Sequence, residues 1–365
     1  MSMRVPKLTI GQFEFELPVV QGAMGVKVSA YPLPPTVANE GGLGTITTIG
    51  LGDPRVSHKD YVLASQEALI AEIKRCQNLT GNFPKPMAVN VMGALSNADS
   101  LITTAVDQGI KIVVYGAGIP RDLPKLVPDP SVNLVPIISS ARLAGIILKH
   151  WTKHYQRLPS AFIVEGPLAG GHLGFNQAEL DHPEIFNLEN ILVGVLATVR
   201  PYEQEFGRRI PIIVAGGIGI EDVPRWLSLG AAAVQLGTLF VATDECPVDQ
   251  RFKDRYLAAK AGDAIIVTTS VGMLGRVLPT PLLAKAEAGS IKIRCPYQCL
   301  SICKIKTAKF CIADALYNAL GGEFDEGLLF AGGNVHKVDR IIPVKQLMTE
   351  IVESIRNSPL TLPAE

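Results

Sequence analysis

The sequence lacks an excess of charge of either sign, because its 365 residues include 34 lysines and arginines and 34 aspartates and glutamates. Charged residues make up 19% of the chain and aromatic residues only 6%. Proteins that bind nucleic acid or anionic membrane surfaces usually carry a basic excess, so neither partner is expected. The expected partner is a small-molecule substrate.

Long apolar runs are also missing. No run approaches the roughly 18 apolar residues that a membrane helix requires, and the first residues do not form the apolar core of a signal peptide. We therefore expect a protein of the cytoplasm, without a membrane partner. Hydrophobic residues nevertheless make up 47% of the chain, enough to build a large core.

Short apolar segments alternate with stretches of helical pattern, and this alternation repeats eight times. Such repetition is typical of a TIM (β/α)8 barrel, an α/β fold. A doubly wound open sheet is the competing fold, but no G-x-G-x-x-G motif directly follows the first segment. The eight segments are residues 17–21, 43–48, 87–91, 110–115, 134–138, 161–164, 210–215 and 232–236.

The chain is longer than the roughly 250 residues of a single barrel, so a smaller, mainly helical second domain is expected. We assign residues 1–244 to the barrel, with a hairpin around residues 10–12 covering one end. Residues 245–335 are expected to form a helical lobe over the barrel mouth. Residues 336–365 are expected to hold a C-terminal helix that packs back on the barrel.

The sixth segment leads into the most informative stretch. The apolar run 161–164 ends at Glu165, and the turn Gly170-Gly171-His172 follows. Polar groups at the carboxyl end of a buried parallel strand lie where α/β enzymes perform their chemistry. Paired glycines let backbone N–H groups approach a ligand closely. An ordinary tight turn with a solvated histidine is the alternative.

The seventh and eighth segments also end in glycine turns, at Gly216-Gly217 and at Gly237-Thr238. In these barrels the loops after the last two strands commonly form a phosphate site. A phosphate-bearing ligand is therefore predicted there.

Six ordered stretches, residues 18–25, 38–46, 165–172, 214–218, 234–238 and 271–276, resemble the nitronate monooxygenases, formerly called 2-nitropropane dioxygenases. The same superfamily includes flavin-dependent enoyl-[acyl-carrier-protein] reductases and NADH:quinone reductases. The resemblance spans about residues 15 to 345 and implies an FMN-binding TIM barrel with a smaller helical domain beside its mouth.

The resemblance also implies which residues bind FMN. Ala23, Met24 and Gly25 would lie along the flavin ring, and Asn90 would hydrogen-bond it. Glu165, Gly170 and Gly171 would lie beside the cofactor. The phosphate and ribityl chain would be held by Gly216, Gly217, Gln235, Gly237 and Thr238. Ser140 is a weaker candidate.

His172 matches the catalytic histidine of the family. An imidazole has an ordinary pKa of about 6.5, so it can take or give a proton near neutral pH. The remaining histidines have no assigned role: His58, His150, His154 and His182 are expected to be solvated, and His336 lies in or beside the lobe.

Four of the six cysteines, Cys295, Cys299, Cys303 and Cys311, lie within 17 residues. If the segment were helical, the first three would share one face. Thiolates at this density suit an iron–sulfur cluster or zinc, and the spacing fits a cluster slightly better than paired zinc knuckles. Small buried side chains in a helical lobe are the alternative, and both interpretations stay open.

The expected enzyme is an FMN-dependent oxidoreductase that oxidises alkyl nitronates with O₂ to carbonyl compounds and nitrite. The alternative is an NAD(P)H-dependent flavin reductase acting on an enoyl thioester or a quinone. A non-catalytic FMN-binding scaffold is less favoured, since it has no need of His172. A barrel resembling IMP dehydrogenase is excluded by the lack of a cysteine between Cys76 and Cys246. Whether the chain forms a homodimer is left open.

Overall fold

The computed structural model of the chain describes residues 4–52, 61–81, 85–293, 295 and 298–363. Eight parallel strands form its central sheet, in the order β3-β11-β10-β8-β7-β6-β5-β4. Their bounds are Val19–Gln21 (β3), Thr45–Thr47 (β4), Ala88–Met92 (β5), Ile112–Gly116 (β6), Asn133–Ile138 (β7), Phe162–Glu165 (β8), Ile212–Ala215 (β10) and Ala233–Leu236 (β11). A parallel bridge between Val20 and Leu43 brings the two ends of the sheet together. The predicted TIM barrel is confirmed.

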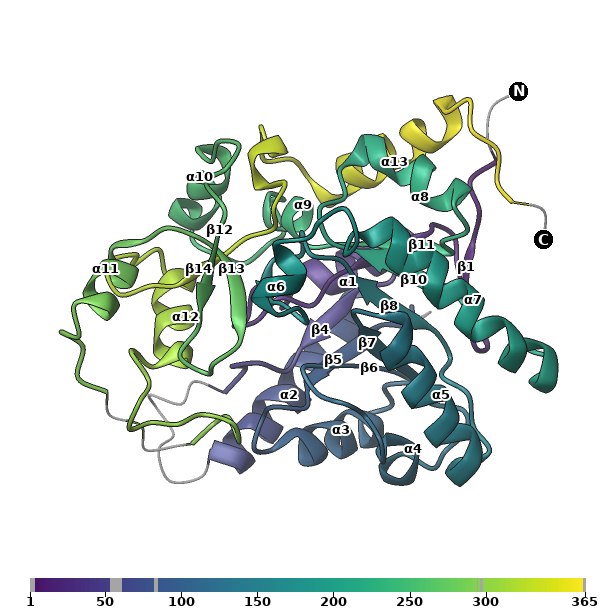
Figure 1. Cartoon of the computed structure of the whole chain (residues 1–365), viewed down its shortest axis with the longest axis horizontal. Helices are drawn as coiled ribbons and strands as arrows, with labels where there is room; N and C mark the ends of the chain where they lie inside the picture. The colour runs from purple at the N-terminus through teal and green to yellow at the C-terminus, as the bar shows by residue number, and fades with distance from the viewer. Residues whose placement is uncertain (1–3, 53–60, 82–84, 294, 296–297, 364–365) are drawn as a thin grey trace.

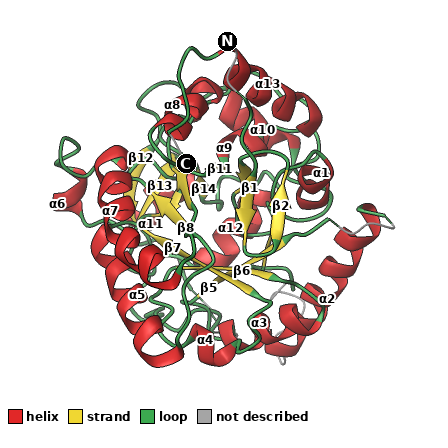
Figure 2. Cartoon of the chain, turned by 90° about the vertical axis from the view of Figure 1, so that its right-hand side faces the viewer, coloured by secondary structure: helices red, strands yellow, loops and turns green. Residues whose placement is uncertain are grey.

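Helices surround the strands, as Figures 1 and 2 show. They are α1 (Leu33–Asn39), α2 (Tyr61–Leu79), α3 (Ala98–Asp107), α4 (Leu123–Leu126), α5 (Ala141–Tyr155), α6 (Gln177–Leu180), α7 (Leu188–Phe206), α8 (Val223–Ser228) and α9 (Thr238–Val241). None of the helices in the described part of the chain is long and apolar enough to cross a lipid bilayer.

Helix α7 contains a proline in its interior. Proline lacks the N–H that a helix interior needs, and it usually ends or kinks a helix. The structure carries the helix through Pro201 to Phe206. It ends only where Gly207 adopts a left-handed conformation with φ of 60°, which glycine accepts without steric cost.

Alternate residues of each strand belong to two different cores. In β8, Ile163 packs among the side chains inside the barrel, whereas Phe162 and Val164 pack outward against the helices. In β10, Ile213 and Ala215 point inward by the same alternation. The barrel is therefore a filled core, and a ligand can enter only at its ends.

The amino-terminal hairpin closes one of those ends. Strands β1 (Leu8–Ile10) and β2 (Phe13–Phe15) pair antiparallel, and Leu8, Ile10 and Phe15 join the inner core of the barrel. At the tip, Gln12 Nε2 donates to the carbonyl of Ser131 (2.8 Å), just before β7. The hairpin predicted around residues 10–12 is confirmed.

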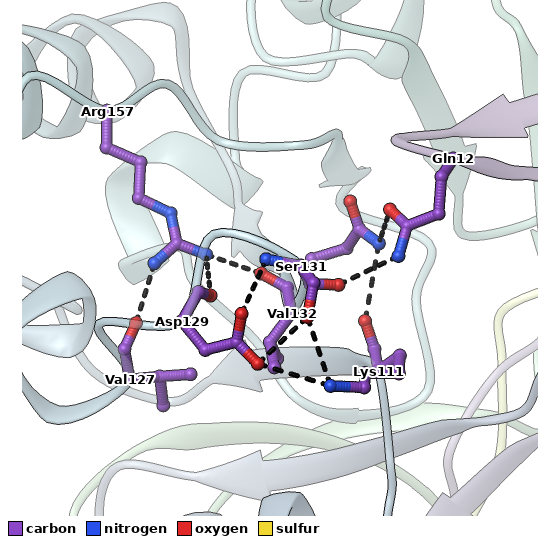
Figure 3. Close-up of polar contacts among 8 residues, drawn as sticks. Gln12, Lys111, Val127, Asp129, Ser131, Val132 and Arg157 are labelled. Atoms are coloured by element: carbon purple, nitrogen blue, oxygen red, sulfur yellow. Dashed lines mark hydrogen bonds and ion pairs between the residues drawn. The ribbon is translucent and has the colours of Figure 1, made fainter.

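Polar contacts fix the loop beside this hairpin (Figure 3). Arg157 donates to the carbonyls of Val127 (2.6 Å) and Val132, and burial lowers the pKa of its guanidinium. The carboxylate of Asp129 accepts from the backbone N–H of Ser131 at 2.8 Å and pairs with Lys111 at 3.2 Å. The end of the barrel that carries the hairpin is thus rigidly built, which leaves the opposite end for function.

A lobe lies beside that opposite end (left in Figure 1). It comprises α10 (Gln250–Leu257), β12 (Ile265–Thr268), β13 (Leu274–Leu278), α11 (Pro281–Glu287), α12 (Ile312–Leu320) and β14 (Leu329–Phe330). The lobe is not helical throughout, because β12, β13 and β14 form an antiparallel sheet. Seven buried residues, among them Val277, Phe310 and Leu328, form its own apolar core.

The lobe and the C-terminal helix both contact the barrel. The hydroxyl of Tyr317, in α12, donates to the carbonyl oxygens of Gly50 and Gly52 in the loop after β4. Helix α13 (Val344–Asn357) packs against α1 and α8, and Ser354 Oγ donates to the carbonyl of Ile220 (2.9 Å). The division at residues 244 and 335 remains a prediction.

Candidate functional site

A cavity of about 310 Å³ lies at the carboxyl ends of the barrel strands, between the barrel and the lobe. Apart from the weaker candidate Ser140, every residue that the sequence analysis placed at the cofactor or in catalysis lines it. From the barrel strands and their loops these are Ala23, Met24, Gly25, Asn90, Glu165, Gly170, Gly171, His172, Gly216, Gly217, Gln235, Gly237 and Thr238. The sequence segments that carry them are far apart, so the barrel topology itself gathers the set.

Glu165 is the last residue of β8 and faces this cavity. Burial raises the pKa of its carboxyl group to about 7, because the apolar surroundings disfavour the charged form. Near neutral pH Glu165 can therefore hold or release a proton.

His172 is held by the lobe as well as by the barrel loop. It lies in the two-residue strand β9 (Gly171–His172), which pairs antiparallel with β13 through His172 and Gly275. Its Nε2 lies 3.2 Å from Oγ1 of Thr269, and its ring meets the ring of Phe330 edge-on, with centroids 5.1 Å apart. Burial lowers its pKa to about 4, so the imidazole is neutral near pH 7.

The far end of the cavity is built from glycine turns. Gly216 and Gly217 have φ of 102° and 73°, values that side chains rarely tolerate. A Cβ at Gly216 would come within 2.9 Å of the backbone nitrogen of Ala169. Within the described residues, the N–H groups of Gly216 and Gly217 donate to no backbone carbonyl. This arrangement suits an anion.

Sequence reasoning missed a lobe segment that completes this end. Gly332 N–H donates to Thr238 Oγ1 (3.3 Å), and Asn334 Nδ2 donates to the carbonyl of Gly217. Lys337 also lines the cavity, paired with Glu221 at 2.5 Å. The glycine pair at 332–333 was the available signal, but nothing in the sequence indicates which strand end such a distant loop meets.

Other candidates lie elsewhere. Ser140 does not line the cavity; its side chain accepts from the N–H of Leu143 and caps α5. His182 is exposed and pairs with Glu184 at 3.0 Å, as expected for a solvated residue. His150 lies beside Asp122 instead, with its Nε2 buried. His336 does not line the cavity, and His58 lies outside the described residues.

In its described residues, the segment that carries Cys295, Cys299 and Cys303 is not helical, so these cysteines do not share one face of a helix. Among the described residues between α11 and α12 there is no helical turn that would align Cys295, Cys299 and Cys303. Cys299 lines the cavity, and Cys311 directly precedes α12. No group of three metal-ligating side chains is arranged around a metal position within the described part of the chain. Metal binding therefore stays a prediction.

A model of the family described as nitronate monooxygenase matches residues 85–354. The chain belongs to this family. Enzymes of the nitronate monooxygenase family depend on FMN, and this chain is an FMN-dependent oxidoreductase. The family resemblance predicted from the sequence is confirmed.

Relatives of this family member carry different names. A (3aS,4S,5R,7aS)-5-hydroxy-7a-methyl-1-oxo-octahydro-1H-indene-4-carboxyl-CoA dehydrogenase of Mycobacterium tuberculosis is 28% identical over 80% of this chain and 70% of that protein. A nitronate monooxygenase of Pseudomonas aeruginosa is 23% identical over 75% and 80%. The structure of FabK from Thermotoga maritima has a TM-score of 0.69 at 25% identity and covers 93% of both chains.

Three observations indicate that the cavity of this nitronate monooxygenase family member suits FMN. One end of the cavity has the positive-φ glycines Gly216 and Gly217 and the ammonium group of Lys337. At Gly237 a Cβ would meet Met24 Sδ at 3.5 Å, so a side chain there would fill the cradle. The side-chain amides of Asn90 and Gln235 line the cavity and bond to no other described residue.

Replacing Glu165 with Gln should change how stability depends on pH. The folded carboxyl has a pKa of about 7 against an ordinary 4.5, so the contribution of Glu165 to the stability of the wild-type apoprotein falls as pH rises from 4.5 to 7. Above pH 7 the variant should be more stable by at most roughly 3 kcal/mol, and near pH 4.5 by almost nothing. Urea unfolding at both pH values measures this.

His172 is present in both proteins, so the difference between them isolates Glu165. The exposed Glu205, on α7, provides the control, since its replacement with Gln should leave the pH dependence unchanged. A difference between wild type and Glu165→Gln that is the same at both pH values would contradict the prediction.

The thiols should divide into two classes of reactivity. Cys76 and Cys246 are 0% and 2% exposed, whereas the four cysteines at 295–311 are partly exposed. Titration of the native protein with a disulfide reagent should modify four thiols, and the other two only after unfolding. If the four were protected instead, together with a stoichiometric content of iron or zinc, the metal site would be supported.

Proposed function

We propose that this enzyme oxidises alkyl nitronates with O₂ to carbonyl compounds and nitrite, with FMN bound in the cavity at the barrel mouth. The observation that carries the proposal is a neutral imidazole, His172, held inside a cavity whose lining matches the family's cofactor residues. The family model supports the same reaction.

FMN would be held mainly by residues of the barrel, with Lys337 added at its phosphate. Gly216, Gly217 and Lys337 would bind its phosphate, and Asn90 and Gln235 would donate or accept hydrogen bonds along its length. When bound, FMN supplies the redox chemistry. The protein contributes binding, orientation and the removal of water.

His172 would act on the proton of the substrate. A nitronate forms when a nitroalkane loses its α-proton, and a neutral imidazole beside the substrate is suited to accept that proton. Because His172 is neutral near pH 7, a base is available without prior deprotonation. The apolar neighbours Leu300, Leu316 and Phe330 would contact the alkyl chain.

The second candidate is an NAD(P)H-dependent flavin reductase, or a dehydrogenase, acting on an acyl thioester. One observation favours it: the lobe gives the cavity an apolar wall of Leu300, Leu316, Leu328 and Phe330, which suits the acyl chain of a thioester. A relative named as a carboxyl-CoA dehydrogenase is 28% identical. A quinone would suit the same wall.

An absorbance spectrum of the holoenzyme, taken without oxygen, separates the two candidates. We expect the flavin bands to change on addition of an alkyl nitronate and not on addition of NADH, and nitrite to form when O₂ is admitted. Rapid bleaching by NADH with no response to the nitronate would overturn the proposed reaction and favour the reductase.

Replacing His172 with Asn should reduce turnover of a neutral nitroalkane by about 10²- to 10⁴-fold, the range that a general base contributes. The ratio of flavin to protein absorbance should stay unchanged, because His172 is one of many cavity residues. His182→Asn, at an exposed position, is the matched control and should keep full activity. Full activity in His172→Asn would remove this residue from the mechanism.

A further inference from the structure

The imidazole of His172 makes one side-chain hydrogen bond among the described residues, and that bond is to Thr269. Thr269 lies in the turn between β12 and β13 and is 3% exposed. Its Oγ1 lies 3.2 Å from His172 Nε2 and 2.9 Å from the carbonyl oxygen of Met273. The turn is closed by the N–H of Thr269, which donates to the same carbonyl at 2.9 Å.

The hydroxyl has a single proton, and its neighbours decide where that proton lies. Two oxygens at 2.9 Å repel each other unless a hydrogen lies between them, so Oγ1 of Thr269 donates to the carbonyl of Met273. Only its lone pairs then remain for His172. The contact at 3.2 Å is therefore a hydrogen bond donated by Nε2–H of His172.

The other ring nitrogen opens toward the cavity. Nδ1 of His172 has no hydrogen-bond partner in the described structure. The atom is also not fully buried, so a ligand can reach it. His172 itself lines the cavity. The edge-on contact with Phe330, whose carbonyl accepts from Tyr256 at 2.6 Å, opposes rotation of the ring.

We propose that Thr269 is a positioning residue that holds the proton of His172 on Nε2 and thereby presents a proton-free Nδ1 to the substrate. A neutral imidazole has one N–H and one lone pair, so fixing the first nitrogen fixes the second. The assignment of the tautomer stands on contacts alone. Only the identity of the substrate rests on the proposed function.

This tautomer suits one kind of chemistry. A nitrogen with a free lone pair can take the α-proton of a neutral nitroalkane, whereas it cannot donate a hydrogen bond to a substrate carbonyl. The proton moves from the α-carbon to Nδ1, and the C–H electron pair passes to the nitro group to give the nitronate. No oxidant is needed for this step.

The experiment uses the holoenzyme labelled with ¹⁵N in its histidines. Long-range ¹H–¹⁵N spectra show which ring nitrogen of each histidine carries the proton, and the signals lost in His172→Gln identify His172. The variants are Thr269→Val, which removes the acceptor at nearly constant volume, and Thr269→Ser, which retains it. Thr280→Val is the control, since this buried threonine donates to Gly327 at 2.7 Å, away from His172.

We expect the proton on Nε2 in wild type, Thr269→Ser and Thr280→Val, and a shift of population toward Nδ1–H in Thr269→Val. A wild-type spectrum with the proton on Nδ1 would overturn the proposal. The same holds if the Thr269→Val spectrum is identical to wild type.

Kinetics provide the second readout. In Thr269→Val, kcat/KM for a neutral nitroalkane should fall about tenfold, the effect of one lost hydrogen bond, and Thr269→Ser should restore it. A nitronate formed beforehand has no α-proton to remove, so its turnover should not change. An equal loss on both substrates would contradict a role in proton transfer. If wild type turns over neither compound, the proposed function fails, and the tautomer spectra alone decide the role of Thr269.

Discussion

The pairing of two residues of β9 with β13 is the contact on which the site depends. Gly171 and His172 come from a barrel loop, and Arg276 and Gly275 come from the lobe. A histidine in a glycine-rich loop would otherwise sample many orientations, because glycine restricts the backbone least. Arg276 adds a second link, since its guanidinium donates to the carbonyl of Pro167 in the same loop at 2.7 Å. The loop and the lobe sheet therefore form one unit.

The two titratable groups that lie along this loop have opposite pKa shifts. Glu165 lies at the start of the loop and His172 near its end, and both line the cavity between the barrel and the lobe. Desolvation penalises whichever form is charged, so the carboxyl pKa rises to about 7 and the imidazole pKa falls to about 4. Groups whose pKa values are separated in this way can divide the roles of proton donor and acceptor. At neutral pH the imidazole of His172 is uncharged, and the carboxyl group of Glu165 is close to half-ionised.

Much of the barrel half of this arrangement could be predicted from the sequence. All eight strands correspond to apolar segments bounded by turns, and the glycine motifs at 170–171, 216–217 and 237 follow directly from strand ends. The parallel strands of a barrel have their carboxyl ends on one side, so the local sequence pattern was enough to predict that these residues lie close together. The full length of α7 could not be predicted in this way, because the helix runs through Pro201, a residue that usually marks a helix end.

The contribution of the lobe to the site could not be predicted, because its strands are short and its contacts with the barrel join segments that are distant in sequence. Strand β9 has two residues and β14 has two, too few to show a period of any kind. Thr269, Asn334 and Lys337 reach the site through contacts between segments more than 90 residues apart in the chain. The regular spacing of Cys295, Cys299 and Cys303 suggested a helix, yet a pattern of period four predicts a helix only when the positions face a common apolar surface.

The site is formed partly by the barrel and partly by the lobe, and this division limits what family membership says about the substrate. The barrel loops provide the glycine turns and the amides of Asn90 and Gln235, whereas the lobe provides Thr269, Phe330 and the apolar wall. On the proposed function and the proposed role of Thr269, a change in the lobe would alter the substrate or the tautomer of His172 and leave the barrel loops unchanged. One fold can host several functions, and the relatives of this chain carry different reaction names. On the proposed function, the substrate would meet the lobe residues Leu300, Leu316, Leu328 and Phe330, whereas the barrel loops would hold FMN.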